Sequence, residues 1–290
     1  MASDFHSTDI RNQMNLIVQG GDIATISLKQ LAKLSGASGI EQITPNAFRL
    51  RVASPSLEIA ALCEQAKLDH AFVPETRKLG DFKLLVMDMD STLITMETID
   101  ELADMAGLKP QVAAITEQAM RGEIEYNESL ARRVALLKGL DQNALQRIYD
   151  ERLKLSPGAD ILLAKAKAAG IKLLLVSGGF TYMTERLQPR LGLDYTYSNV
   201  LEIVNGKLTG QVLGRIVNAD AKRDELIRVR DALGLTREQI AGVGDGANDL
   251  KFLAECGVSV AYHAKPIVRG QTTHTLNFTG MDGMAWLLGG

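Results

Sequence analysis

The chain has 290 residues, of which 46% are hydrophobic and 23% charged. This length allows one large domain or two smaller ones, and the proportions are those of an ordinary globular protein. A net charge of −3 argues against a nucleic-acid-binding or anionic-membrane surface. No apolar run approaches the length of a membrane span and residues 1–6 show no secretory pattern, so we expect a cytoplasmic protein. Cys63 and Cys256 are predicted to be core thiols.

Residues 1–80 are predicted to form a small α+β domain. Strand patterns at 15–19, 39–43, 48–52 and 69–73 combine with helical patterns at 25–34 and after Ser56. The order β-α-β-β-α-β is that of a ferredoxin-like fold, and it resembles the ACT-type regulatory domains of amino-acid enzymes. A regulatory, a dimerisation or a packing role fits this pattern. Residues 74–78 are expected to be a linker, so a chain beginning near Arg77 should remain active.

Two aspartates follow the first buried strand of the remaining chain. Residues 84–87 form an uninterrupted apolar run, as in a strand covered on both faces, and Asp88 and Asp90 come directly after it. Ligands of open α/β sheets bind at the carboxyl ends of the strands. Two neighbouring carboxylates repel each other, and hard oxygen ligands suit Mg²⁺. The pair can therefore hold a metal, or one aspartate can attack phosphorus while the other transfers a proton.

A helical block separates this strand from the next. Amphipathic patterns at 97–106, 112–120, 128–138 and 142–153 contain no strand candidate. The block is too long for a crossover helix, and we expect a helical cap over the strand ends at about 97–155. Pro157 is expected in the first turn of the helix that returns to the main domain.

Three further motifs lie at a strand end or a helix start. Ser177-Gly178-Gly179 follows the strand at 171–176 and can bring backbone N–H groups close to an oxyanion. Lys222 lies near a helix start, an unfavourable place for a cation unless an anion holds it there. The segment 244–249 follows the strand at 240–243 and suits a metal-binding turn. Alternating strands and helices to the C-terminus predict an α/β fold with a doubly wound parallel sheet over residues 81–290.

These motifs, in this order, resemble the haloacid dehalogenase superfamily of phosphatases. The strings Asp-Ser-Thr…Glu-Thr-Ile-Asp-Glu, Val-Ser-Gly-Gly-Phe and Val-Gly-Asp-Gly-Ala-Asn-Asp are similar to those of its phosphoserine phosphatase family. The resemblance covers residues 83–290. It implies hydrolysis of O-phosphoserine, a small-molecule substrate, through an aspartyl-phosphate, which is the last step of serine biosynthesis. Another small phosphomonoester, such as phosphothreonine, is the alternative.

The resemblance also implies roles for individual residues. Asp88 matches the nucleophile and Asp90 the general acid and base, while Mg²⁺ matches the side chains of Asp88 and Asp245 and the backbone carbonyl of Asp90. The remaining roles concern the substrate and its surroundings: Ser177, Gly178 and Lys222 match the phosphate contacts, Glu97 and Arg133 match the groups that bind the serine ammonium and carboxylate, and Asn248 and Asp249 match residues around the substrate, the metal and the lysine.

Overall fold

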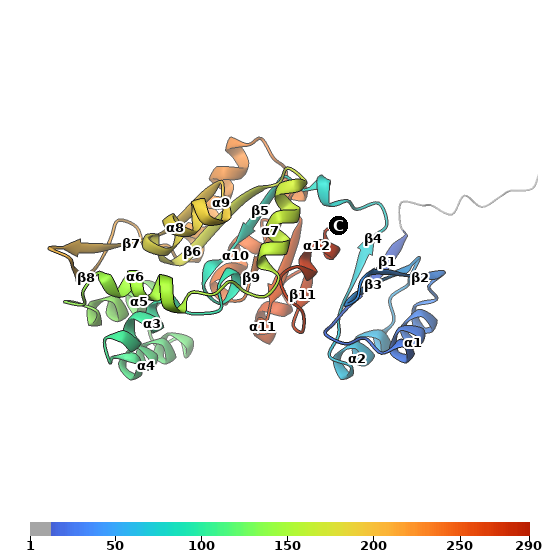
Figure 1. Ribbon diagram of the computed structural model, residues 1–290, viewed down its shortest axis with the longest axis horizontal. Coiled ribbons are helices and arrows are strands. Elements are labelled where there is room, and N and C mark those ends of the chain that lie inside the picture. Colours follow the sequence, from blue (N-terminus) through green and yellow to red (C-terminus); the bar gives the residue numbers. More distant parts are fainter. Residues whose placement is uncertain (1–12) are drawn as a thin grey trace, which may run out of the picture.

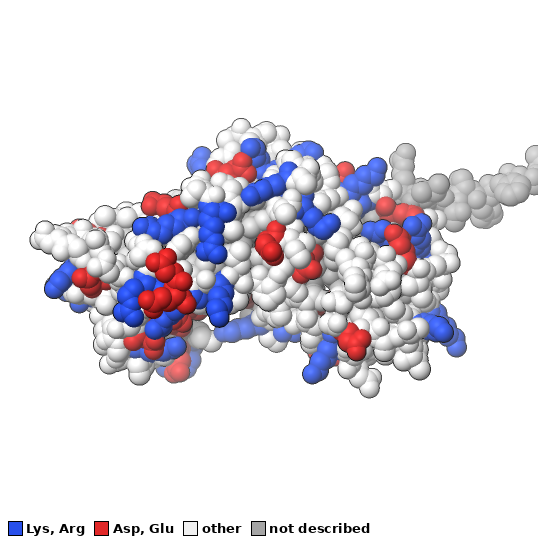
Figure 2. Space-filling model, in the orientation of Figure 1, with Lys and Arg blue, Asp and Glu red and all other residues white. Residues whose placement is uncertain are grey.

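The computed structural model describes residues 13–290, which form a small N-terminal domain and a larger α/β domain (Figure 1). The first residues, on which the expectation of no secretory segment rests, lie outside the described part. Within residues 13–290, no helix has both the length and the hydropathy needed to cross a bilayer. Positive and negative side chains are interspersed on the face seen in Figure 2.

The N-terminal domain has the predicted order of strands and helices. Its sheet has the order β2-β3-β1-β4, and neighbouring strands are antiparallel. Helix α2 starts where predicted, because the Ser56 hydroxyl accepts a hydrogen bond from the Glu58 N–H at 3.3 Å. The elements are β1 (Met14–Gln19), α1 (Thr25–Ser35), β2 (Gly39–Thr44), β3 (Ala47–Arg51), α2 (Leu57–Gln65) and β4 (Asp69–Pro74).

The α/β domain is built on a sheet with the order β11-β10-β9-β5-β6-β7-β8. All neighbouring strands are parallel except β7 and β8, which form a hairpin with Asn205 and Gly206 at positive φ. The strands are β5 (Leu84–Met87), β6 (Lys172–Phe180), β7 (Tyr195–Val204), β8 (Lys207–Leu213), β9 (Ile240–Gly244), β10 (Val258–Tyr262) and β11 (His274–Leu276). The helices are α7 (Ala159–Ala168), α8 (Thr181–Leu191), α9 (Ala219–Ala232), α10 (Leu250–Leu253), α11 (Pro266–Arg269) and α12 (Gly283–Leu287).

The central strands are apolar without alternation because both of their faces are buried. Leu84 and Val86 belong to a core that also contains Leu226 of α9 and Phe252 of α10. Their neighbours in β5 join a second core, which includes residues of α7, α8 and α12. The doubly wound parallel sheet predicted from the sequence is therefore present, and its central strand β5 ends at Met87, directly before Asp88.

Four helices form the cap that follows β5: α3 (Thr98–Met105), α4 (Lys109–Met120), α5 (Tyr126–Leu136) and α6 (Asn143–Arg147). The predicted helix at 142–153 is present, because α6 continues without a break into a wider helical turn, Ile148–Arg152. The prediction that Pro157 lies in the first turn of the next helix is wrong. Gly158, at φ 74°, separates Pro157 from the start of α7.

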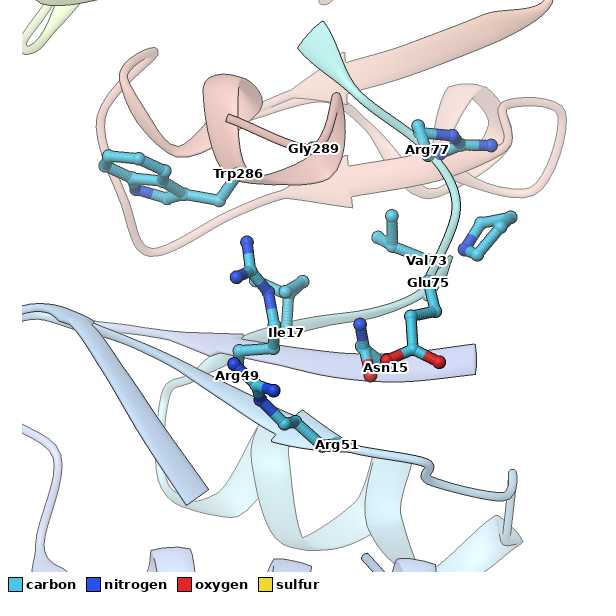
Figure 3. A pocket seen from close by; sticks show the side chains of 10 residues that line it. Asn15, Ile17, Arg49, Arg51, Val73, Glu75, Arg77, Trp286 and Gly289 are labelled. Carbon is cyan, nitrogen blue, oxygen red and sulfur yellow. The ribbon is translucent and has the colours of Figure 1, made fainter. Parts of the chain in front are cut away.

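One face of the N-terminal sheet packs on the α/β domain, and the other carries α1 and α2. Ile17, Ala47 and Val73 share a core with Met284 and Leu287 of α12. A cavity of about 230 Å³ remains at this junction, lined by residues of both domains (Figure 3): Asn15, Ile17, Arg49, Arg51, Val73, Pro74, Glu75, Arg77, Trp286 and Gly289. It contains none of the site residues predicted from the sequence.

Candidate active site

A buried ion pair lies at the end of the central strand. Lys222 Nζ is 2.8 Å from Asp88 Oδ1 and 2.8 Å from Asp249 Oδ1, and its side chain is fully buried. Burial alone would lower the pKa of this ammonium, but the carboxylates of Asp249 and Asp88 outweigh it and raise the pKa. The anions that hold a lysine in the first turn of α9, inferred from its unfavourable place beside the helix dipole, are therefore these two carboxylates.

Asp88 itself is 5% exposed. Burial and the Asp249 carboxylate raise its pKa well above the ordinary value, while Lys222 opposes them. One carboxylate oxygen also accepts a hydrogen bond from the Met89 N–H at 2.7 Å. The Asp88 side chain is thus fixed beside a cation at the carboxyl end of β5, in an environment where a further positive charge would favour its ionised form.

Asp90 lies on the turn after Asp88. Burial and the Glu97 carboxylate raise the pKa of Asp90 to about 8, so this carboxyl is mainly protonated at neutral pH. The Thr98 hydroxyl donates to its Oδ1 at 2.7 Å. A protonated, oriented carboxylic acid is the form that can give a proton to a departing oxygen.

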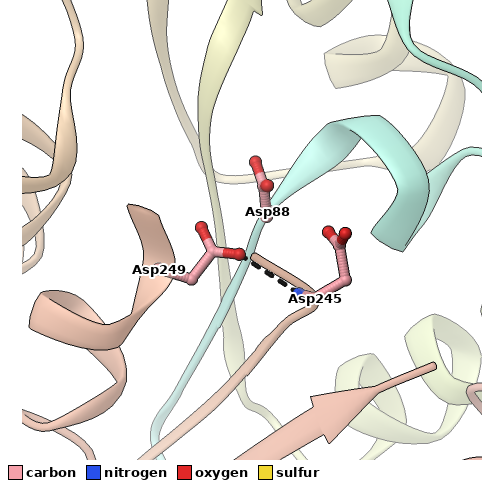
Figure 4. Close-up of side chains that lie close together, drawn as sticks. All are labelled: Asp88, Asp245 and Asp249. Carbon is pink, nitrogen blue, oxygen red and sulfur yellow. Dashed lines mark hydrogen bonds between the residues drawn. The ribbon is translucent and has the colours of Figure 1, made fainter. Parts of the chain in front are cut away.

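Three carboxylates gather where β5 and β9 end. Oxygen atoms of Asp88, Asp245 and Asp249 lie within 4.8 Å of one another. Figure 4 shows the three side chains gathered at this point. Asp249 accepts from Lys222 through Oδ1 and from the backbone N–H groups of Asp245 and Gly246 through Oδ2. Because both of its oxygens have donors, Asp88 and Asp245 are the better candidates for metal ligands.

The second of these, Asp245, has a pKa raised to about 6, by burial first and then by the Asp249 carboxylate. The Thr92 hydroxyl donates to Asp245 Oδ1 at 2.9 Å and holds its orientation. Two carboxylates with this mutual repulsion and hard oxygen donors fit a divalent cation.

Residues 177–179, called the glycine turn below, lie at the carboxyl end of β6 and not after it as predicted, and they approach Asp90 closely. Ser177 is fully buried, and its Oγ accepts a hydrogen bond from the Gly179 N–H at 2.8 Å. A Cβ on Gly179 would be 2.6 Å from Met89 Cε and 3.0 Å from Asp90 Oδ2. A side chain here would displace Met89 or Asp90, which favours glycine, and the pairing of β6 with β7 is interrupted between Val176 and Phe180 at this turn.

The three remaining predicted residues lie around this centre. Glu97 directly precedes α3 and is not in its first turn, and Glu97 Oε1 accepts from the Ser91 hydroxyl at 2.6 Å. Part of Glu97 is exposed to solvent. The protein around its carboxylate still removes enough water to raise the pKa, and the hydrogen bond from Ser91 and the Arg133 charge partly offset this rise. Arg133 Nε donates to the Ser129 carbonyl oxygen at 3.3 Å. Asn248 lies against Gly246 and is not bonded to Lys222 in the described part.

Thr92, Thr98 and Asn199 were not predicted as site residues. Asn199, 1% exposed, donates to the Gly178 carbonyl oxygen at 2.7 Å and accepts from the Val217 N–H at 2.8 Å, which fixes the glycine turn. In the sequence, Asn199 is a single polar residue in the segment that forms β7, and this pattern does not show which groups it contacts. Thr92 and Thr98 stand in strings quoted for the family resemblance but carry no signal of which carboxylate they contact.

Comparison with known proteins gives two family matches. Residues 82–257 match the family described as haloacid dehalogenase-like hydrolase, and residues 16–59 match a domain of unknown function. The phosphoserine phosphatase of Polaromonas sp. is 53% identical over 210 residues, which are 71% of this chain and 89% of the relative.

Two solved structures extend the comparison. An unliganded probable phosphoserine phosphatase from Vibrio cholerae has a TM-score of 0.84 and 35% identity, covering 96% of this chain and 87% of its own. A phospho-aspartyl intermediate analogue of phosphoserine phosphatase has a TM-score of 0.64 and 36% identity over 68% of this chain and 93% of its own. The chain therefore belongs to the phosphoserine phosphatase family of the haloacid dehalogenase-like hydrolases.

Proposed function

We propose that this chain hydrolyses O-phosphoserine to serine and inorganic phosphate through an aspartyl-phosphate on Asp88, the last step of serine biosynthesis. The observation that carries the proposal is the contact of 2.8 Å between Asp88 and Lys222 at the end of β5, with the Asp90 carboxyl two residues further on. A nucleophile, a fixed cation and a proton donor are the groups that phosphoryl transfer requires.

In the first step, an Asp88 carboxylate oxygen attacks phosphorus and the bond from phosphorus to the serine oxygen breaks. Asp90 gives its proton to that oxygen, so serine leaves with a neutral hydroxyl. In the second step, Asp90 takes a proton from water as the water oxygen attacks phosphorus. The bond between Asp88 and phosphorus then breaks, which regenerates the carboxylate and releases phosphate.

Charge stabilisation comes from groups that the fold fixes in advance. Lys222 and the backbone donors of the turn at Ser177 and Gly178 face the phosphoryl oxygens, and Asp249 holds the ammonium in place. These donors need no rearrangement when charge moves from Asp88 to the leaving oxygen, because their own partners already orient them. Asn248 is assigned to the same phosphate-facing edge.

Mg²⁺ is the metal we propose, held by the side chains of Asp88 and Asp245 and the backbone carbonyl of Asp90. When bound, it neutralises part of the charge on the nucleophile and the phosphoryl group. The oxygen-only donor set favours Mg²⁺ over softer metals. Thr92 keeps Asp245 turned toward the cluster through its hydrogen bond of 2.9 Å.

Selectivity for serine is assigned to the cap. Glu97 offers a carboxylate to the substrate ammonium, and Arg133 offers a planar guanidinium suited to the substrate carboxylate. The Arg133 charge lowers the pKa of Glu97, and this supports the placement of both residues at one site. A phosphate ester without these two groups would lose both contacts.

Location and assembly complete the proposal. The free, buried thiols of Cys63 and Cys256 fit a reducing compartment such as the cytoplasm. A homodimer is supported by β2, which stands at the edge of the N-terminal sheet and can pair with a second copy. Sedimentation analysis of the full chain tests the dimer, and a monomer at micromolar concentration would contradict it.

The test of the function is phosphate release from a panel of phosphomonoesters. We expect the highest kcat/KM for phosphoserine, loss of turnover in excess chelator, and recovery with Mg²⁺. Asp88→Asn should lack activity while keeping its fold, and trapped label should map to Asp88. Asp231→Asn, a change at an exposed aspartate of α9, is the matched control. Phosphate label on Ser91 or Ser177 would contradict the mechanism.

A further inference from the structure

The first turn of α5 touches both elements that surround the proposed phosphate position. A Cβ on Gly178 would overlap the hydroxyl oxygen of Tyr126, the first residue of α5. The next residue, Asn127, accepts a hydrogen bond through Oδ1 from Asn218 Nδ2 at 3.0 Å. Asn218 caps α9, the helix that carries Lys222 in its first turn. The cap is therefore anchored at this turn to the glycine loop and to the lysine helix.

The Tyr126 hydroxyl lies among the charged groups of the site. Burial raises the pKa of its phenol, and the charges of Lys222 and Arg133 oppose this rise while those of Asp88 and Asp90 add to it. The hydroxyl therefore keeps its proton and can donate a hydrogen bond. Within residues 13–290 this hydroxyl has no hydrogen bond to another residue. Tyr126 is half-buried, so this donor, which has no acceptor in the described part of the chain, is accessible to a ligand.

The position of the hydroxyl indicates which ligand atom could be that acceptor. Gly178 belongs to the turn assigned to the phosphoryl oxygens, and Tyr126 approaches this residue so closely that a Cβ there would overlap its hydroxyl. Arg133 follows two turns later on the same helix, so one helix would carry a contact to each end of the substrate.

We propose that the Tyr126 hydroxyl donates a hydrogen bond to a non-bridging phosphoryl oxygen of the substrate, and that the Asn127–Asn218 contact holds Tyr126 in this position. The proposal rests on the proposed function. Tyr126 then contacts the substrate, whereas Asn127 and Asn218 are positioning residues. The cap would then supply a donor to the phosphoryl group as well as the groups that bind the serine ammonium and carboxylate.

The test compares Tyr126→Phe with Tyr149→Phe. Tyr149 is the matched control because its hydroxyl lies elsewhere in the cap, 3.5 Å from the Arg186 carbonyl oxygen. Tyr126→Phe keeps the ring and should lower kcat/KM about tenfold for both phosphoserine and phosphoethanolamine, as expected for one lost hydrogen bond to a charged group. Tyr149→Phe should leave both values unchanged.

Binding of inorganic phosphate, measured by calorimetry on the full chain with Mg²⁺, gives a readout that does not depend on turnover. Tyr126→Phe should weaken phosphate binding by a factor similar to its loss in kcat/KM. Unchanged phosphate binding, or a loss confined to phosphoserine, would overturn the proposal while leaving the hydrolysis of phosphoserine intact. Absence of phosphoserine turnover in the natural chain would instead remove the proposed function.

The positioning role is tested by Asn127→Ala, alone and combined with Tyr126→Phe. If Asn127 acts through Tyr126, the single change should lower kcat/KM severalfold, and adding it to Tyr126→Phe should cost little more. Asn127→Asp keeps the accepting oxygen and should restore most of the activity. Losses that simply multiply in the double variant would contradict this coupling.

Discussion

The carboxylate of Asp69 accepts hydrogen bonds from both the backbone N–H and the hydroxyl of Thr279, at 2.9 and 2.8 Å, across 210 residues of sequence. The N–H groups of Asn277 and Phe278 donate to the same carboxylate at 2.7 and 2.9 Å. Asp69 belongs to β4 of the N-terminal domain and is 2% exposed. It joins the two domains through one buried anion with four donors.

Asp69→Ala should therefore destabilise the protein. Three backbone N–H groups would lose their acceptor, and we expect the free energy of unfolding to fall by about 3 kcal/mol. Urea unfolding followed by fluorescence measures the change. Asp22→Ala, an exposed site of the same domain, should change it by less than about 0.5 kcal/mol. Equal effects of the two changes would show that Asp69 does not hold the domains together.

The same contact bears on the shortened chain beginning near Arg77. It would keep every proposed catalytic residue, but it would expose the part of α12 that Ile17, Ala47 and Val73 cover. We therefore expect activity with lower thermal stability and a tendency to aggregate. A shortened chain as stable as the full one would mean that the N-terminal domain contributes little to folding.

Asp90→Asn should slow both the departure of serine and the hydrolysis of the aspartyl-phosphate, by a factor on the order of 10²–10⁴, because the amide cannot transfer the proton. Rapid-quench kinetics separates the two steps. Thr98→Ser, which keeps the hydroxyl that donates to Asp90, serves as the control and should stay near the natural rate. Near-normal turnover by Asp90→Asn would remove Asp90 from the proton transfers.

Asp245→Ala should raise the Mg²⁺ concentration needed for half-maximal activity sharply, since one of two ligand side chains is lost. Thr92→Val should raise it less, because it removes only the hydrogen bond that orients Asp245. Activity titrated with Mg²⁺ against a chelator gives both values. An unchanged requirement in Asp245→Ala would exclude this aspartate as a ligand.

Arg133→Ala should cost roughly 2–5 kcal/mol in kcat/KM for phosphoserine, the range found when one partner of an enclosed charge pair is removed. The loss should be far smaller for phosphoethanolamine, which has no carboxylate. Arg132→Ala, at an exposed arginine one position earlier, controls for a general effect on α5. Equal losses on the two substrates would make Arg133 a structural residue.

The pH dependence of stability should contain a contribution from His274. Burial first and then the Arg77 guanidinium lower its pKa from 6.5 to about 4. Between these values the unfolded chain binds a proton that the folded chain does not, so stability falls as the pH drops from about 6.5 toward 4 and is unaffected above. The contribution is up to about 3 kcal/mol.

Unfolding of His274→Gln at pH 7.5 and at pH 4.5 checks this contribution. The variant should lose less stability than the natural chain between the two pH values, because glutamine takes up no proton. The other acidic groups titrate in both proteins, so the difference between the two curves isolates His274. Parallel curves would contradict the lowered pKa.

The α/β fold and the location of the candidate site could both be predicted from local sequence patterns. Uninterrupted apolar runs predicted strands buried on both faces, and parallel strands place their carboxyl ends at one edge, so Asp88, Ser177 and Asp245 had to lie near one another. The unfavourable place of Lys222 at a helix start indicated that an anion could hold it there, as an alternative to an ordinary surface position. These inferences need only local pattern and sheet geometry.

Only the tertiary structure decided which side chains orient these residues. Thr98 on Asp90, Asn199 on Gly178 and Tyr126 over the glycine turn depend on how the cap and neighbouring strands approach, and no period in the sequence encodes such contacts. The docking of Asp69 on Thr279 is of the same kind. A single polar residue at a strand end looks the same in sequence whether it faces water or a buried donor, because its partner lies far along the chain.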